Sequence, residues 1–398
     1  MRVLGKIDLA GRIVAALFFI QWSIFQVMLR NWDRVEVATK FFLGNDFEYL
    51  YKAAGLFVDG KNPYLEPGFI PLPSALYIPL LLHHLSFWNA LIAFRTFCFF
   101  LVVAAMLWLC RELHMNVLNS SLLMLITLTY VPFYTVLTGG NLDALMLAFL
   151  VFACARKDVV RAAFLGLSIG TKFYSLLLIP VLALQRRWRE VTLALAMLAI
   201  LLLPFLRYMP EAFNSVLHRT SVLRLGSNES PAVLFILLFG QDRTWAWASS
   251  YALLWGGTLI LRVIGDSKNV ANNNQRWRAL DYVPWMAAAP ALVFTYTGTI
   301  LLPVLACVIR KNQDRELSWA EWLMVSGFVL TGIYPVVSAQ ALSFAFSVFG
   351  IPGSRLDTAL VAIAPLGISA VLLGSSMAAL RGSSGASEKV LTAVPTGS

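Results

Sequence analysis

The sequence predicts an all-α polytopic membrane protein of about 10–12 helices, with several short or broken membrane segments. Hydrophobic residues make up 59% of the 398 residues and charged residues 13%, against about 45–50% and about 25% in soluble domains. The apolar residues form long runs, and short basic clusters lie between them, as in membrane proteins. This pattern excludes a soluble enzyme, a disordered protein and a nucleic-acid-binding protein, although the net charge is +10.

Apolar runs between polar breaks give the expected helices in order. The first run, 12–30, follows Arg2 and Lys6 and begins at Arg12, like a signal peptide, but its apolar part is too long and no small-residue cleavage site follows it. We therefore expect it to be an uncleaved first span. The later runs are 72–82 with 86–110, 118–137, 141–155, 160–172, 174–185, 190–207, 245–264, 280–297, 298–310, 319–340 and 357–380.

Several of these runs are shorter than the roughly 20 residues that a transmembrane helix needs. They are concentrated in 138–185, where breaks such as Gly139-Gly140-Asn141 and Gly170-Thr171-Lys172 interrupt the apolar sequence. Broken helices at membrane depth are tolerated where they are buried in protein or line a cavity. A polar cavity is therefore expected near these breaks.

The distribution of Lys and Arg predicts the orientation in the membrane. With the N-terminus in the cytoplasm, 19 of the 31 basic residues fall on the cytoplasmic side and 10 outside, in agreement with the positive-inside rule. A single integral membrane domain, 1–381, then presents two long loops, 31–71 and 208–244, to the extracytoplasmic face. The Gly- and Ser-rich segment 382–398 is expected to be a disordered cytoplasmic tail.

The first outer loop contains an amphipathic stretch, 45–58, whose pattern predicts a helix lying on the outer membrane surface. Asn45 is a candidate cap for this helix, and Asp46 and Glu48 fall in its first turn. A carboxylate that faces an apolar, partly dry pocket can act as a general base. Asp46 is therefore the leading candidate, and the alternative is that it only helps to cap the helix.

Charged residues inside apolar segments are the next candidates, because such residues mark functional sites by default. Lys172 either meets a lipid phosphate or extends to the membrane interface. Arg95 pairs either with a carboxylate such as Asp143 or with a lipid phosphate. Asp143 itself either lies within the membrane or opens the next helix.

The second outer loop adds three polar candidates. Arg219 and Arg224 are placed to hold a phosphate, and Asn228 to bind a hydroxyl or cap a helix, against the alternative of a solvated interfacial loop. The sequence contains no Walker motif, GxGxxG, GxSxG or HExxH. We therefore expect no nucleotide chemistry, no cofactor and no metal site.

Five segments of the chain, taken in order, resemble one enzyme family. They are N-D-F-E-Y-L-Y-K-A-A (45–54) with N-P-Y (62–64), P-S-A-L-Y-I-P-L-L (73–81), G-N-L-D-A-L-M-L-A-F-L (140–150), F-L-G-L-S-I-G-T-K-F-Y-S-L-L-L-I-P with R-R-W-R (164–189), and S-N-E-S-P (227–231). Over roughly residues 1–310 the chain resembles glycosyltransferase family 87, the polyprenol-phosphate-sugar-dependent mannosyl- and arabinosyltransferases of the GT-C superfamily. The piece around Lys172 is the most specific.

The resemblance implies a GT-C-like helix bundle, an acidic general base in the first outer loop and a lipid-linked sugar donor. Asp46 matches the acidic position, Lys172 the lysine before the aromatic residue, and Asn228 the N-x-S motif. The chain departs from the family pattern at 140–143, where G-Q-x-N is frequent, and at 294–298, where the family often has a histidine.

The sequence therefore predicts an integral membrane glycosyltransferase of the cell membrane, with both termini cytoplasmic and its active site extracytoplasmic. It moves mannose or arabinose from a polyprenyl-phosphate donor to a glycolipid or glycan acceptor, with inversion and without a metal. A transporter or flippase for a lipid or lipid-linked sugar is the alternative, because broken helices and intramembrane charges also suit that class. The expected base is Asp46, and the expected substrate-binding residues are Glu48, Lys172, Arg219, Arg224, Asn228, Asn141, Asp143 and Arg95.

Overall fold

The computed structural model describes residues 44–66, 68–69, 71–154, 158–220, 230–240, 242–268, 280–288, 295–313, 316–333 and 363–391. Over these residues the chain is helical and has no strand. The helices long and apolar enough to cross a membrane are Phe87–Glu112, Trp188–Ser215, Thr244–Asp266 and Ile363–Arg381. The predicted all-α polytopic membrane protein is thus confirmed, while the expected first span, 12–30, lies outside the described residues.

A further candidate span is broken where the sequence predicted one helix over 118–137. The helices Val117–Thr129 and Pro132–Gly139 are apolar enough to cross together, and they meet at an angle of 55°. Pro132, in the first turn of the second helix, lacks the N–H that a continuous helix would need at this point. The bend therefore follows from the sequence Tyr130-Val131-Pro132.

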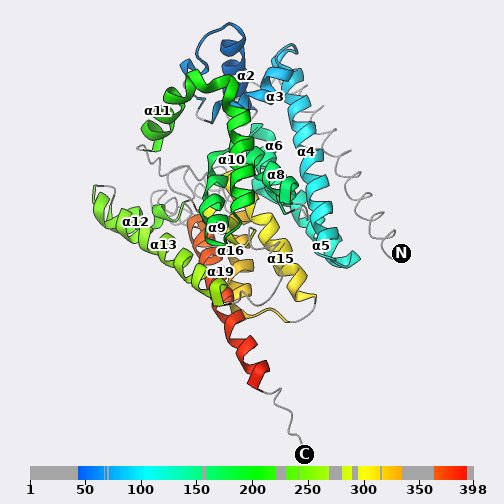
Figure 1. The fold of residues 1–398 in the computed structure, drawn as a ribbon, viewed down its shortest axis with the longest axis vertical. Coiled ribbons are helices and arrows are strands. Elements are labelled where there is room, and N and C mark those ends of the chain that lie inside the picture. The colour runs from blue at the N-terminus through cyan, green and yellow to red at the C-terminus, as the bar shows by residue number, and fades with distance from the viewer. Residues whose placement is uncertain are drawn as a thin grey trace, which may run out of the picture. The chain divides into compact units, whose positions relative to one another are not determined.

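The chain forms two compact units, Met1–Val222 and Leu223–Ser398. The first unit is built from many short elements, which Figure 1 shows in blue to green. They are α2 (Asn45–Val58), η2 (Pro63–Leu65), η3 (Pro73–Leu76), α3 (Tyr77–Leu82), α4 (Phe87–Glu112), α5 (Val117–Thr129), α6 (Val131–Gly139), α7 (Asp143–Phe152), α8 (Asp158–Thr171), η4 (Phe173–Leu177), α9 (Leu178–Leu184), α10 (Trp188–Leu202), η5 (Leu203–Tyr208) and α11 (Met209–Thr220).

The helix predicted over 45–58 is confirmed as α2, but its cap differs from the expectation. Gly44, not Asn45, is the N-cap, and no side chain caps the helix. Gly44 has a φ of +83°, which glycine adopts without strain, and its N–H donates to the carbonyl of Thr138 at 3.0 Å. A Cβ at Gly44 would lie 2.6 Å from Leu91, so this close approach requires glycine.

The short helices of the first unit are buried against one another. The ten-residue α7 packs against α4 and α8. The helix α8 also packs against α10 (Figure 1). Gly166 lies where α8 meets α10, and a Cβ there would be 2.8 Å from the carbonyl oxygen of Ala194. Ser74 on η3 donates to the carbonyl of Gly170 at 2.6 Å. Burial in protein thus accounts for helices too short to cross a membrane alone.

The segment 208–244, expected to be a loop, contains helical structure. It includes α11 and the eight-residue α12 (Ala232–Phe239). The sequence of α11 is strongly amphipathic, and this period indicates a helix that the polar composition of the segment had concealed. That the segment faces the outside stays a prediction.

The second unit is dominated by longer helices. The helix α16 packs along α19, and α13 also packs on α19. Gly327 and Gly367 allow α16 and α19 to approach, because a Cβ on either would lie 2.4 to 2.6 Å from the other's carbonyl oxygen. The elements are α12, α13 (Thr244–Lys268), η8 (Leu280–Tyr282), α14 (Val283–Ala287), η9 (Thr295–Leu301), α15 (Leu302–Asn312), α16 (Trp319–Ile333) and α19 (Ile363–Leu391).

The helix α19 continues through 382–391, the first part of the expected tail, and 392–398 lie outside the described residues.

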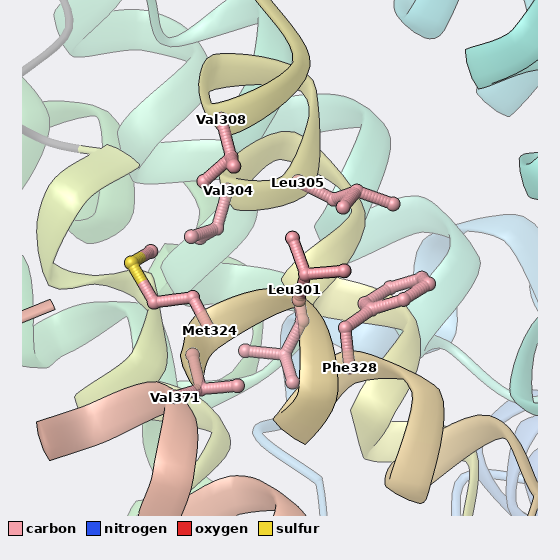
Figure 2. Close-up of a pocket in the computed structure, with 8 residues that line it drawn as sticks. Leu301, Val304, Leu305, Val308, Met324, Phe328 and Val371 are labelled. Atoms are coloured by element: carbon pink, nitrogen blue, oxygen red, sulfur yellow. The ribbon is translucent and has the colours of Figure 1, made fainter. Parts of the chain in front are cut away.

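A small apolar cavity of about 10 Å³ lies among α15, α16 and α19, lined by residues such as Val304, Met324 and Val371 (Figure 2). This volume holds one water at most, and its apolar walls offer that water no partner. The cavity is a packing gap rather than a binding site.

Arg262 and Asp266 of α13 are neutralised inside the second unit. Arg262 lies 2.5 Å from a carboxylate oxygen of Asp281 and 3.0 Å from one of Asp266. Tyr282 donates to Asp266 at 2.8 Å. A charge on an apolar helix needs such partners, so we assign this cluster to the stability of the unit.

Candidate active site

Asp46 lies at the start of α2, against the break between α6 and α7. Its Oδ2 accepts a hydrogen bond from the Asn141 side-chain amide at 2.8 Å. Gly139 and Gly140 make this approach possible. A Cβ on Gly139 would lie 3.3 Å from Asp46 Oδ2, and one on Gly140, where φ is +66°, would lie 2.6 Å from Phe47 Cβ. The glycine pair therefore allows the first turn of α2, which carries Asp46, to pack against the break between α6 and α7.

Glu48 points away from this cluster. Its carboxylate is 2.6 Å from the ammonium of Lys52, and the Glu48 side chain is 43% exposed. Residues two apart on a helix lie about 200° apart around its axis, so only one of the two acids can face the protein. Asp46 is the acid that faces it.

Lys172 and Asp143 form a buried ion pair next to Asp46. The Lys172 ammonium is 2.8 Å from Asp143 Oδ1, with the side chains 14% and 0% exposed. Asp143 is the first residue of α7, as one sequence reading expected. Lys172 separates α8 from η4 in an extended conformation, and the ammonium also lies 5.6 Å from the ring centre of Tyr174. The lysine is thus turned toward protein groups rather than extended to the interface.

The Asn141 side chain connects the two acidic residues. Its Oδ1 accepts the backbone N–H of Asp143 at 2.9 Å, while its amide nitrogen donates to Asp46. Because only the oxygen of the amide can accept, the N–H of Asp143 fixes which side of Asn141 faces Asp46. The break 140–143 therefore orients the carboxylate of Asp46.

Arg95 has a different partner from the one expected. It is buried on α4 and donates to the carbonyl oxygen of Thr138, which also accepts the N–H of Gly44. The ion-pair partner of Asp143 is Lys172. Arg95 thus holds the start of α2 against the end of α6, a role that sequence reasoning missed because it runs through a backbone carbonyl.

Burial raises the pKa of Asp46 above that of an ordinary aspartate. The hydrogen bond from Asn141 and the positive charge of Lys172 oppose this rise, and the negative charge of Asp143 adds to it. A carboxylate held in this way is more basic than one in water and lies beside a cation. The group can therefore take a proton while negative charge develops nearby.

The candidates of the second loop were Arg219, Arg224 and Asn228. Arg219 lies in α11, and Arg224 and Asn228 lie outside the described part of the chain.

Sequence reasoning treated the pair Gly139 and Gly140 only as a helix break. Their adjacency to Asn141 was the available signal that a backbone approaches closely there.

The fold and this cluster define a multi-pass membrane protein with a buried acid, amide and lysine suited to group transfer. The model of glycosyltransferase family 87 matches residues 71–280, more than half of the chain, and the chain belongs to this family. It is therefore a glycosyltransferase. The match includes Asn141, Asp143 and Lys172, whereas Asp46 precedes it. A comparison with curated proteins finds no match.

Proposed function

We propose that this glycosyltransferase moves mannose or arabinose from a polyprenyl-phosphate donor to a glycolipid or glycan acceptor at the extracytoplasmic face. The observation that carries the proposal is the meeting of Asp46, Asn141, Asp143 and Lys172, which come from separate segments of one unit. This cluster offers a base and a cation in one place, as the transfer of a sugar from a phosphate requires.

In the proposed reaction, Asp46 takes the proton of an acceptor hydroxyl while that oxygen attacks the anomeric carbon. The bond between the anomeric carbon and the phosphate oxygen breaks, and its electron pair leaves with the polyprenyl phosphate. In-line displacement inverts the anomeric centre. The raised pKa of Asp46 favours this role, because a general base works best when its pKa approaches the working pH.

Lys172 is the proposed partner of the leaving phosphate, with Arg219 or Arg224 as the second cation. A charge-assisted contact that strengthens as negative charge develops lowers the barrier of such a step. The donor carries one phosphate, whose charge one or two basic side chains can neutralise. The proposal therefore uses no divalent ion.

The helix α2 presents Asp46 to the interior of the first unit. Asp46 is in the first turn of this amphipathic helix, and the apolar side chains of Phe47 and Leu50 are at most 2% exposed. A donor sugar must therefore reach Asp46 within the protein, while its lipid tail remains in the bilayer. The distribution of basic residues along the sequence favours the extracytoplasmic side for this helix.

The proposal is tested with the purified full-length protein and a panel of polyprenyl-phosphate sugars. We expect one donor to be consumed, polyprenyl phosphate to be released and the new glycosidic bond to have the inverted configuration. Asp46→Asn is the blank, and nucleotide sugars are the donor control. Consumption of a nucleotide sugar would overturn the donor assignment. Movement of an intact lipid-linked sugar across the bilayer of proteoliposomes, with no sugar transferred to an acceptor, would favour a flippase.

A further inference from the structure

Asp143 lies in an apolar environment, where an ionised carboxylate costs free energy. It is fully buried, and its α7 neighbours Ala144, Leu145 and Met146 are buried and apolar. Asp143 is ion-paired with Lys172, whose ammonium lies 2.8 Å from Oδ1, and in the described part of the chain Oδ2 accepts no hydrogen bond. A buried carboxylate that is held at one oxygen only needs a reason beyond folding.

Asp143 is also linked to the proposed base, Asp46, through its backbone. Its backbone N–H donates to Asn141 Oδ1 at 2.9 Å, and Asn141 then donates to Asp46 Oδ2 at 2.8 Å. Asp143 is therefore linked to Lys172 through its side chain and to Asp46 through its backbone.

We propose that Asp143 is a positioning residue that serves both halves of the transfer: its carboxylate holds the ammonium of Lys172, and its backbone N–H turns the Asn141 amide toward Asp46. This inference rests on the proposed function, in which Asp46 takes the proton and Lys172 meets the leaving phosphate. Without donor, Lys172 is held by Asp143. When a donor phosphate enters, the same ammonium faces two anions and remains in place between them.

The arrangement also controls the charge of Asp46. The negative charge of Asp143 disfavours ionised Asp46, the positive charge of Lys172 favours it, and the effect of Lys172 is the larger. Glu48, on the same helix, is paired with Lys52. Ionisable groups on the elements packed against α2 include Arg95 on α4, Tyr134 on α6, Tyr77 and His83 at α3, and Tyr64 on η2. Asp143 on α7 and Lys172 after α8 act on Asp46 from beyond these elements.

The variant Asp143→Asn separates these roles. It keeps the size of the side chain and the backbone N–H that holds Asn141, and it removes only the charge. The readout is the protonation of Asp46 in the purified full-length protein without donor. It is followed against pH by the infrared carboxyl band that disappears in Asp46→Asn.

We expect the protonation midpoint of Asp46 to move to higher pH in Asp143→Asn, because the released Lys172 no longer favours ionised Asp46 and its effect exceeds that of the Asp143 charge. Adding Lys172→Met should then move the midpoint little further. The control is Asp59→Asn, the same chemical change at the other end of α2, about 20 Å away at 1.5 Å per residue. The Asp59 carboxylate is 60% exposed, and this variant should leave the midpoint unchanged.

An unchanged or lower midpoint in Asp143→Asn would overturn the inference, because Lys172 would then act on Asp46 without being held by Asp143. The acidic limb of kcat/KM in the sugar-transfer assay should move in the same direction as the infrared midpoint, which a merely structural defect would not do. If the midpoints shift as expected but no polyprenyl-phosphate sugar is consumed, the proposed function fails and the coupling stands. If transfer depends on Asp46 while Asp143→Asn shifts nothing, the inference alone fails.

Discussion

Removing Lys172 should destabilise the first unit because it strands the carboxylate of Asp143. The Asp143 side chain is 0% exposed, that of Lys172 is 14% exposed, and Asp143 Oδ2 accepts no hydrogen bond in the described chain. Breaking a buried ion pair from one side costs about 3–5 kcal/mol. We therefore expect Lys172→Met, which keeps the apolar stem, to lower the free energy of unfolding by about 3–5 kcal/mol.

The double variant Lys172→Met/Asp143→Asn should recover most of this loss, because it leaves no buried charge without a partner. Lys61→Met is the matched control. Lys61 and its partner Asp59 are each 60% exposed, and such pairs contribute about 0–1 kcal/mol. Stability is measured by denaturant titration of the detergent-solubilised protein, with the folded fraction followed by size exclusion.

Two outcomes would refute this reasoning: a loss in Lys172→Met no larger than in Lys61→Met, or a double variant no more stable than Lys172→Met. Either would mean that the carboxylate of Asp143 finds water or another partner. The expected loss also bears on donor binding. The contribution of Lys172 to donor affinity is best measured by comparing the double variant with Asp143→Asn, since neither variant strands a carboxylate.

Two further predictions concern the base and the packing of the second unit. Asn141→Ala removes a hydrogen bond that stabilises ionised Asp46, so the pKa of Asp46 should rise further. The acidic limb of the pH–rate profile should then move to higher pH, and an unmoved limb would contradict the assignment. Gly327→Ala places a Cβ 2.4 Å from the Gly367 carbonyl oxygen and should cost about 1–3 kcal/mol in thermal unfolding. Gly256→Ala, with no atom within 4 Å, should be neutral or stabilising, and equal losses in the two variants would refute the close packing.

The parts of the site that could be predicted from sequence are those governed by local pattern. The amphipathic period of 45–58 gave a helix with the observed bounds. Helical geometry then showed that Asp46 and Glu48 could not share one environment. The bend at Pro132 and the short, buried α7 likewise follow from residues adjacent in the chain.

The remaining features depend on contacts between distant segments. The sequence offered Arg95 as a partner of Asp143, but the packing of α7 on α8 brings Lys172 to it instead. The hydrogen bond between Asn141 and Asp46 forms because Gly139 and Gly140 leave room for the start of α2. The sequence pattern does not show which segment of the chain will pack against these glycines. Local pattern thus proposes candidates, and tertiary packing decides their partners.

The most direct test of the account is the turnover of Asp46→Asn beside Glu48→Gln. Asparagine keeps the size of the side chain but cannot take a proton. Turnover should therefore fall by about 10²–10⁴-fold, the usual contribution of a general base, while donor binding is retained. Glu48→Gln should be close to normal, because Glu48 is exposed and paired with Lys52. Near-normal turnover in Asp46→Asn would contradict the central claim, and loss of turnover only in Glu48→Gln would assign the base to the other face of α2.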